Sequence, residues 1–243
     1  MIIVRYREIG LKGKNRSDFE RKLRENIKHC LKKHSISFEK VLRTQGRILI
    51  YTDHECPQLK YVYGISSFSY AKEVPVNLET IKEEAAKLWR EGTFRITIKR
   101  AQKVLMSSQE LGQTVGEYVS EKTGAVPDLE KPEHIIHIEL SNNHAYLYTE
   151  KNPGPGGLPT GVEGRVTLQN ENSIKAGIMV LKRGVALDVV KEQDVDYTEL
   201  EKFSYGFTIK ELDRIPEDTD AVVVSDTLNS IKEYPYFVLR PLI

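Results

Sequence analysis

Hydrophobic and polar positions in the first part of the chain follow the order strand, helix, strand, strand, helix. Residues 2–6 alternate as in a strand. Residues 17–34 carry an apolar side chain at every fourth position, which predicts a helix with one buried face, and Ser17 with Glu20 predicts a capping box at its start. Apolar runs on either side of Gln45-Gly46 predict a hairpin. Residues 1–70 are therefore expected to form a ferredoxin-like domain.

The next pattern, over residues 71–162, predicts a second α/β unit. Apolar spacing indicates a helix over residues 78–89, and Ser107 to Glu110 has the form of a capping box at the start of another helix. Strands are expected near residues 94–98, 136–140 and 145–148.

A segment rich in Gly and Pro, residues 152–159, then predicts a structured linker, because such residues are unsuited to the interior of a helix or strand. Residues 163–243 alternate short apolar strands with helical segments, as in a parallel α/β layer. The sequence thus predicts three domains, 1–70, 71–162 and 163–243, of mixed α+β and α/β class.

Charge changes this picture because it is unevenly distributed. The chain of 243 residues has a net charge of only +1, but residues 1–105 carry +11 and the rest carry −10. A basic half in a nearly neutral protein favours a polyanionic partner, although a solvated helix face explains the same charges. No apolar run approaches the roughly 18 residues of a membrane helix, and residues 1–6 resemble a strand rather than a signal peptide. We therefore expect a cytoplasmic protein with no membrane partner.

Two groups of polar residues are candidates for anion binding. The first surrounds a Gly/Lys-rich loop, expected over residues 10–15, just before a predicted helix; it consists of Lys12, Lys14 and Arg16. The second leaves a predicted strand and continues to the start of the next helix; it consists of Arg95, Lys99, Arg100, Lys103, Ser107, Ser108 and Gln109. Both suit phosphate groups. The alternative for each is a solvated edge that charge protects from aggregation.

Other chemistry finds little support in the sequence. The chain contains no Walker-type G-K-[ST], and the glycine pattern that starts at Gly154 meets Pro159 where a dinucleotide fingerprint needs glycine. His134 and His137 lie on opposite faces of a predicted strand with no cysteine nearby, so no metal site is predicted. Cys30 is expected to be a small core residue, and neither it nor Cys56 belongs to a C-x-x-C motif.

Several of these segments resemble the tRNA 4-thiouridine synthase, or tRNA sulfurtransferase, family. At the start of the chain, the segments are Ile3 to Tyr6, Glu8-Ile9-Gly10-Leu11-Lys12-Gly13-Lys14-Asn15-Arg16 and Phe19-Glu20. Further on, they are Phe94-Arg95, Lys99-Arg100, Ser107 to Leu111, Ala145 to Glu150 and Pro153 to Gly161.

The resemblance covers residues 1–165 and implies a ferredoxin-like domain, a THUMP domain and a Rossmann-like PP-loop domain that is here shortened. It implies that the first two domains bind tRNA and that THUMP holds the acceptor end with its unpaired 3′ CCA. On this basis the seven cations of the two candidate groups are expected to neutralise phosphates. Ser107, Ser108 and Gln109 are expected to make polar contacts near the 3′ end.

The third domain departs from the family pattern. Alignment on Lys182 to Val185 places the adenylating loop S-G-G-x-D-S on residues 168–173, where Gln169 and Asn170 replace both glycines and Asn172 replaces the aspartate. Only Ser173 is retained. Because the glycines let backbone amides approach the pyrophosphate, ATP binding is not expected and no cofactor is predicted. The sequence also ends before the sulfur-carrying cysteine of the family, to which neither cysteine here corresponds.

These departures leave three hypotheses. The favoured one is a tRNA-binding protein without catalytic residues, and therefore not itself an enzyme. A second is participation in 4-thiouridine synthesis, with a homodimer or a partner thiolation protein that supplies the missing groups. A third is a protein–protein interaction module.

Overall fold

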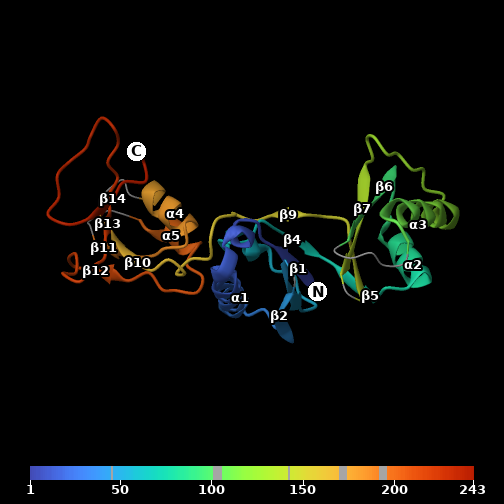
Figure 1. Cartoon of the computed structure of the whole chain (residues 1–243), viewed down its shortest axis with the longest axis horizontal. Coiled ribbons are helices and arrows are strands. Elements are labelled where there is room, and N and C mark those ends of the chain that lie inside the picture. The colour runs from blue at the N-terminus through green and yellow to red at the C-terminus, as the bar shows by residue number, and fades with distance from the viewer. Residues whose placement is uncertain (45, 101–105, 142, 170–173, 192–195) are drawn as a thin grey trace. The chain divides into compact units, whose positions relative to one another are not determined.

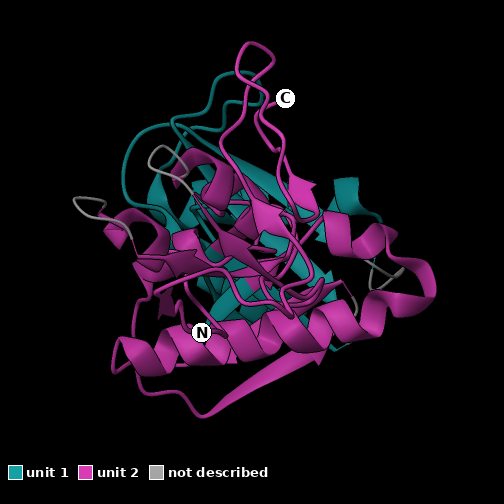
Figure 2. Cartoon of the chain, turned by 90° about the vertical axis from the view of Figure 1, so that its left-hand side faces the viewer, with its two compact units in different colours: residues 1–3, 69–151 teal, residues 4–68, 152–243 magenta. Residues whose placement is uncertain are grey.

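A computed structural model describes the whole chain except residues 45, 101–105, 142, 170–173 and 192–195. The predictions for Lys103, Asn170, Asn172 and Ser173 therefore lie outside the described residues. The chain divides into two compact units, one of residues 1–3 and 69–151 and the other of residues 4–68 and 152–243 (Figure 2).

The N-terminal strands and helix have the ferredoxin-like order that the sequence predicts (Figure 1). Helix α1 (Arg16–Lys33) buries its predicted apolar stripe, and the hairpin of β2 (Lys40–Thr44) and β3 (Arg47–Tyr51) pairs in antiparallel register. The sheet has the order β2-β3-β1-β4-β9, with strands β1 (Ile2–Arg5), β4 (Ser67–Tyr70) and β9 (Asn152–Pro153). The last of these is a two-residue strand inside the predicted linker.

The start of α1 differs from the prediction. The expected loop over residues 10–15 is replaced by two 3₁₀ helices, Glu8–Leu11 and Gly13–Asn15, and the residue before α1 is Asn15, which makes no side-chain cap. Ser17 therefore lies inside the first turn, and the predicted capping box is wrong. The physical reason is that the 3₁₀ turns run directly into the helix, while the Glu20 carboxylate is held by tertiary contacts described below.

The first unit contains a four-stranded sheet of order β5-β8-β7-β6 with two helices. Strands β6 (Phe94–Arg100) and β7 (His134–Ser141) are parallel and are connected through α3 (Ser108–Thr123). Strands β5 (Lys72–Pro75) and β8 (His144–Tyr148) complete the sheet in antiparallel pairing. The apolar faces of α2 (Leu78–Leu88) and α3 share one buried core with the sheet.

The C-terminal part of the second unit forms a parallel five-stranded sheet of order β12-β11-β10-β13-β14. The elements, in chain order, are β10 (Arg165–Leu168), α4 (Ile174–Lys182), β11 (Ala186–Val190), α5 (Thr198–Glu201), β12 (Glu211–Leu212), β13 (Val222–Val223) and β14 (Val238–Leu239). This confirms the predicted mixed α/β class. The strand order reverses direction beside β10, and such a switch point is where open α/β sheets bind ligands.

The α/β sheet domain packs on the ferredoxin-like part of the same unit through residues 160 and 203–206. The Asn26 amide donates to the Thr160 carbonyl over 3.0 Å, and Lys22 Nζ donates to the Gly206 carbonyl over 3.3 Å. The ring of Tyr63 stacks on that of Phe203 with centroids 4.9 Å apart. Helix α1 is therefore part of two packing surfaces, one against its own sheet and one against the C-terminal domain.

Buried tyrosines predict a loss of stability at high pH. Burial raises the pKa of Tyr63 to about 12, and burial followed by donation to Glu20 raises that of Tyr6 to about 12 from 10.0. The folded state thus holds these protons more tightly than the unfolded state, so the stabilisation is complete below pH 10 and is lost as pH rises towards 12. Urea midpoints measured between pH 9 and 12 are expected to fall, and the fall is expected to be smaller in the Tyr63→Phe variant.

Candidate nucleic-acid interface

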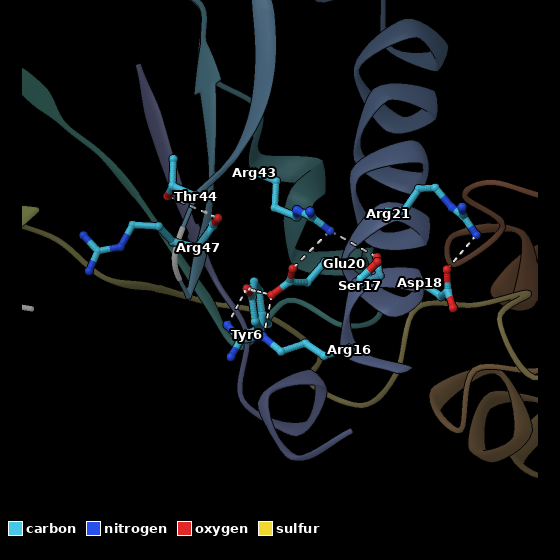
Figure 3. Close-up of polar contacts among 9 residues, drawn as sticks. All are labelled: Tyr6, Arg16, Ser17, Asp18, Glu20, Arg21, Arg43, Thr44 and Arg47. Carbon is cyan, nitrogen blue, oxygen red and sulfur yellow. Dashed lines mark hydrogen bonds and ion pairs between the residues drawn. The ribbon is translucent and has the colours of Figure 1, made fainter. Parts of the chain in front are cut away.

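Of the first predicted cluster, Arg16 contacts the buried carboxylate of Glu20, where Tyr6 and Arg43 also meet it (Figure 3). Arg16 Nε lies 2.6 Å from Glu20 Oε1, and Arg43 lies 3.4 Å from Glu20 Oε2 and from the Ser17 carbonyl oxygen. The hydroxyl of Tyr6 donates to Glu20 and accepts from Arg16 over 3.3 Å. These hydrogen bonds raise the pKa of Arg16. Glu20 thus holds two arginines that remain partly exposed.

The two lysines of this cluster differ in their contacts. Lys12 Nζ lies 3.1 Å from Glu163 Oε1 and 4.5 Å from the centre of the Phe19 ring. Lys14 is exposed in the second 3₁₀ helix, with no ion-pair partner in the part of the chain that the structure describes. Lys14 is therefore the member whose charge is most available to a ligand, while Lys12 and Arg16 also hold local structure.

The second predicted cluster lies on β6 and at the start of α3, in the other unit. Arg95 donates to the Leu129 carbonyl over 2.9 Å, and Arg100 donates to the Met106 carbonyl over 2.9 Å. Lys99 is exposed near the end of β6, between these two arginines in sequence. These carbonyl contacts do not neutralise the arginine charges, because a carbonyl group carries no formal charge, but the Glu110 carboxylate interacts electrostatically with Arg100.

The capping box that the sequence predicts at Ser107 is present. The Ser107 hydroxyl oxygen accepts from the backbone N–H of Glu110 over 3.1 Å, and the Glu110 carboxylate accepts from the Ser107 N–H over 2.7 Å. These donors lower the pKa of Glu110. Ser107 is thereby committed to the helix start, whereas Ser108 and Gln109 lie on the first turn of α3 and line a groove.

This groove, between β6 and α3, has a volume of about 950 Å³. Its floor is apolar because Ile96 and Ile98 of β6 face Gly112 and Gly116 of α3, which have no side chains to cover them. Polar groups line it at both ends of the helix face; they are Arg95, Ser108, Gln109, Gln113, Glu117, Ser120 and Glu121. Arg95, Ser108 and Gln109 of the predicted set line this one groove. Gln113 and Glu117 also line it but were not predicted, and their only signal in the sequence is the pair of glycines in α3.

The carboxyl edge of the C-terminal sheet is where the family's nucleotide loop would lie. Of the loop residues only Leu168 and Gln169 are described, and the amide oxygen of Gln169 accepts a hydrogen bond from the Tyr236 hydroxyl. Asp226, buried at the end of β13, accepts from Arg240 Nε over 3.0 Å and from the Tyr234 hydroxyl over 2.9 Å. The described side chains of this edge thus hydrogen bond to one another.

Membrane spans and metal sites are both absent from the described residues. No helix in the described ranges is long and apolar enough to cross a membrane. No three His, Cys, Asp or Glu side chains outside the undescribed segments gather in a way that would hold a metal ion.

Comparisons with known proteins agree with the fold. Residues 1–69 match the ThiI ferredoxin-like domain and residues 76–150 match the THUMP domain. A probable tRNA sulfurtransferase of Brevibacillus brevis is 36% identical over 213 residues, which cover 82% of this chain and 53% of the relative. The chain spans about half the length of these curated relatives.

Two solved structures extend the comparison. The crystal structure of PH1313 from Pyrococcus horikoshii covers all of this chain and 94% of its own, with a TM-score of 0.83 and 29% identity. A 4-thiouridine synthetase–RNA complex with bound ATP matches 78% of this chain and 51% of its own, with a TM-score of 0.66 and 30% identity. Through its ferredoxin-like and THUMP domains, this chain belongs to the tRNA sulfurtransferase family.

Proposed function

We propose that this chain binds tRNA and that the groove between β6 and α3 receives the unpaired 3′ CCA end. The observation that carries the proposal is the groove itself, which has an apolar floor and is lined by the cation Arg95. The chain belongs to a family that acts on tRNA. Arg95, in the groove, and Lys99, exposed on the same strand outside its lining, supply charge for the phosphates of the single strand.

The groove suits bases as well as phosphates. Nucleobases gain stability when their flat faces leave water for apolar surfaces such as Ile96 and Ile98. Cytosine and adenine present exocyclic amino groups, for which the carboxylates of Glu117 and Glu121 are acceptors. Gln109 at the opposite end has donors and an acceptor for sugar hydroxyls. This arrangement supports a reader of C and A rather than a general polyanion site.

The decisive experiment compares intact tRNA with tRNA lacking its 3′ CCA, in the wild-type chain and in Gly116→Leu. The leucine side chain would occupy the space above Ile96, so we expect affinity for intact tRNA to fall about tenfold. The matched control is Gly116→Ala, whose Cβ would lie 3.8 Å from Ile96 Cγ1, an ordinary contact. Alanine is expected to bind within about twofold of wild type and to stabilise the helix slightly.

Removal of CCA is expected to weaken the wild-type complex by a similar factor and to have little further effect on Gly116→Leu. Each affinity is measured across a salt series, since phosphate contacts make it salt-dependent. Binding of equal strength to both tRNA forms would contradict the groove as the 3′-end site. Binding that is indifferent to salt would favour the interaction-module hypothesis.

A finer part of the proposal concerns chemistry. The hydrogen bond between Gln169 and Tyr236 supports the proposal that this chain does not adenylate tRNA itself. Any role in 4-thiouridine synthesis would then need a partner that supplies the ATP chemistry and a reactive cysteine. Pyrophosphate exchange with ATP and purified tRNA is expected to be absent. Exchange by this chain alone would contradict the proposal, and 4-thiouridine loss from tRNA after deletion of the gene would support the partnered role.

A further inference from the structure

The groove between β6 and α3 has two chemically different ends, because the helix runs antiparallel to the strand. An added Cβ at Gly112 would lie 3.6 Å from Ile98, and one at Gly116 would lie 3.8 Å from Ile96. Residue numbers thus rise along α3 where they fall along β6. The last turns of α3 therefore lie beside the start of β6, and its first turn lies beside the end of that strand.

The end beside the first turn of α3 is suited to phosphate groups. Arg100 lies on the same side of β6 as the apolar floor and donates to the carbonyl of Met106, just before the helix, over 2.9 Å. Ser108 and Gln109 line the groove here, at the N-terminus of a helix of 16 residues, which carries a partial positive charge. Glu110, the acidic residue of this turn, is held by the capping box and is not among the described residues that line the groove. This end is the phosphate end of the groove.

The opposite end carries an excess of negative charge and is the carboxylate end. Glu117 and Glu121 line the groove there on successive turns of α3, and both are exposed. The C-terminus of the helix adds partial negative charge. Among the described residues that line the groove, Arg95 is the one cation at this end. Two carboxylates thus accompany one guanidinium group, so this end disfavours a further anion.

Leu129 forms the rim of the carboxylate end. Its side chain lines the groove and is nevertheless 73% exposed. The preceding segment is fixed on the edge of β6, because the Phe94 N–H donates to the Val126 carbonyl over 3.1 Å and the Asp128 N–H donates to the Phe94 carbonyl over 2.9 Å. Arg95 holds the carbonyl of Leu129 itself over 2.9 Å. A large apolar side chain that a fixed backbone keeps in water is positioned to contact a ligand.

We propose that the RNA strand enters the groove at the phosphate end and terminates at the carboxylate end, where Leu129 covers the last nucleoside against Ile96. The 3′-terminal nucleoside of tRNA has no phosphate on its 3′ side, so it is the part of the strand that can lie beside two carboxylates. The preceding nucleotides each bring a phosphate, and these lie towards Arg95 and the start of α3. The groove therefore selects a free 3′-hydroxyl and rejects a 3′-phosphate. This inference rests on the proposed function and adds the direction of the strand and the chemical form of its end.

The first test compares two forms of one tRNA on the wild-type full-length chain, one with a 3′-hydroxyl and one with a 3′-phosphate. The terminal phosphate brings about two negative charges to the carboxylate end, so we expect affinity to fall about fivefold at low salt and less at high salt. Equal affinity for the two forms would overturn the inference. If tRNA without CCA still bound more weakly in that case, the proposed function would stand, so the two failures are distinguishable.

A charge variant with a matched control locates this effect. Glu121→Gln is expected to reduce the fivefold difference between the two tRNA forms to about twofold, because it removes one of the repelling carboxylates. The control Glu83→Gln removes the same charge from an exposed position of α2 that does not line the groove, and it is expected to leave the difference unchanged. An undiminished difference in Glu121→Gln would contradict the placement of the strand end.

A second pair of variants tests the rim. Leu129→Ser is expected to weaken the binding of intact tRNA about fivefold and to leave the binding of tRNA without CCA unchanged, since only the terminal nucleoside contacts the side chain. The control is Val126→Ser, which replaces an apolar side chain of the same segment that is 64% exposed and does not line the groove. It is expected to bind both forms as the wild type does. Equal effects of the two substitutions would contradict a role of Leu129 at the strand end.

Discussion

Replacement of Gly157 by alanine is expected to destabilise the second unit by about 3–5 kcal/mol, the largest effect of any substitution considered for this chain. Gly157 is buried with φ +73, and an added Cβ would lie 2.2 Å from the carbonyl oxygen of Lys182, the last residue of α4. That oxygen accepts from the Leu158 N–H over 2.9 Å, so it cannot move without loss of a hydrogen bond. The Gly157 N–H in turn donates to Glu8 Oε1 over 3.0 Å.

The neighbouring glycine provides the matched control. Gly156 has φ +69, but nothing lies within 4 Å of the position that a Cβ would take. Gly156→Ala therefore tests the backbone strain alone, which is about 1–2 kcal/mol. Urea unfolding followed by circular dichroism is expected to place Gly157→Ala well below Gly156→Ala. Equal midpoints for the two variants would show that the close approach of the linker to α4 has no energetic importance.

These glycines show where sequence reasoning succeeds and where it stops. The Gly/Pro pattern of residues 152–159 predicts a structured linker, and the structure places Asn152 and Pro153 of that segment in the strand β9. A two-residue strand has no periodicity of its own and depends on an available sheet edge, here that of β4. The same holds for β12, which follows the edge of β11 and was not predicted.

Long elements were predicted because their pattern repeats several times. The stripe from Phe19 to Leu31 gives α1, and the capping box at Ser107 gives the start of α3. The analogous box at Ser17 fails although its residue types are the same. At Ser107 the glutamate three positions later is exposed to solvent and turns back to the backbone, whereas Glu20 is buried beside arginines from α1 and β2. Only tertiary structure distinguishes the two cases.

The candidate site was partly predictable for a similar reason. Runs of cations are visible in sequence, but the acidic partners of Arg16 and Lys12 are Glu20, four residues away, and Glu163, in another domain. The groove between β6 and α3 exists because some positions of α3 are glycines, which carry no side chain. It can therefore be recognised only once the packing of the helix on the strand is known.

Glu20→Gln is expected to lower the free energy of unfolding by about 2 kcal/mol. The side chain of Glu20 is 9% exposed and accepts from Arg16, Arg43 and Tyr6, so the neutral amide leaves two cations without their anionic partner. The cost stays below that of a fully buried pair because both arginines remain partly exposed and regain water.

The control is Asp18→Asn on the same helix. Asp18 lies 2.9 Å from Arg21, with both side chains more than half exposed (Figure 3). Solvent-exposed pairs of this kind contribute little, so the change in stability is expected to stay within about 0.5 kcal/mol. Both substitutions remove one negative charge from α1, and chemical denaturation therefore reports the effect of burial rather than of net charge.

The same two variants separate structure from RNA binding. If the cations of α1 contact tRNA, release of Arg16 and Arg43 from Glu20 gives the phosphates two better-available partners, and Glu20→Gln is expected to bind tRNA more tightly at low salt despite its lower stability. In Glu20→Gln the slope of log affinity against log salt concentration is expected to steepen by about one to two units. In Asp18→Asn we expect that slope to change by less than about one unit. An unchanged slope in Glu20→Gln would show that Arg16 and Arg43 act only within the fold, and would leave Lys14 and the cations of β6 to hold the RNA.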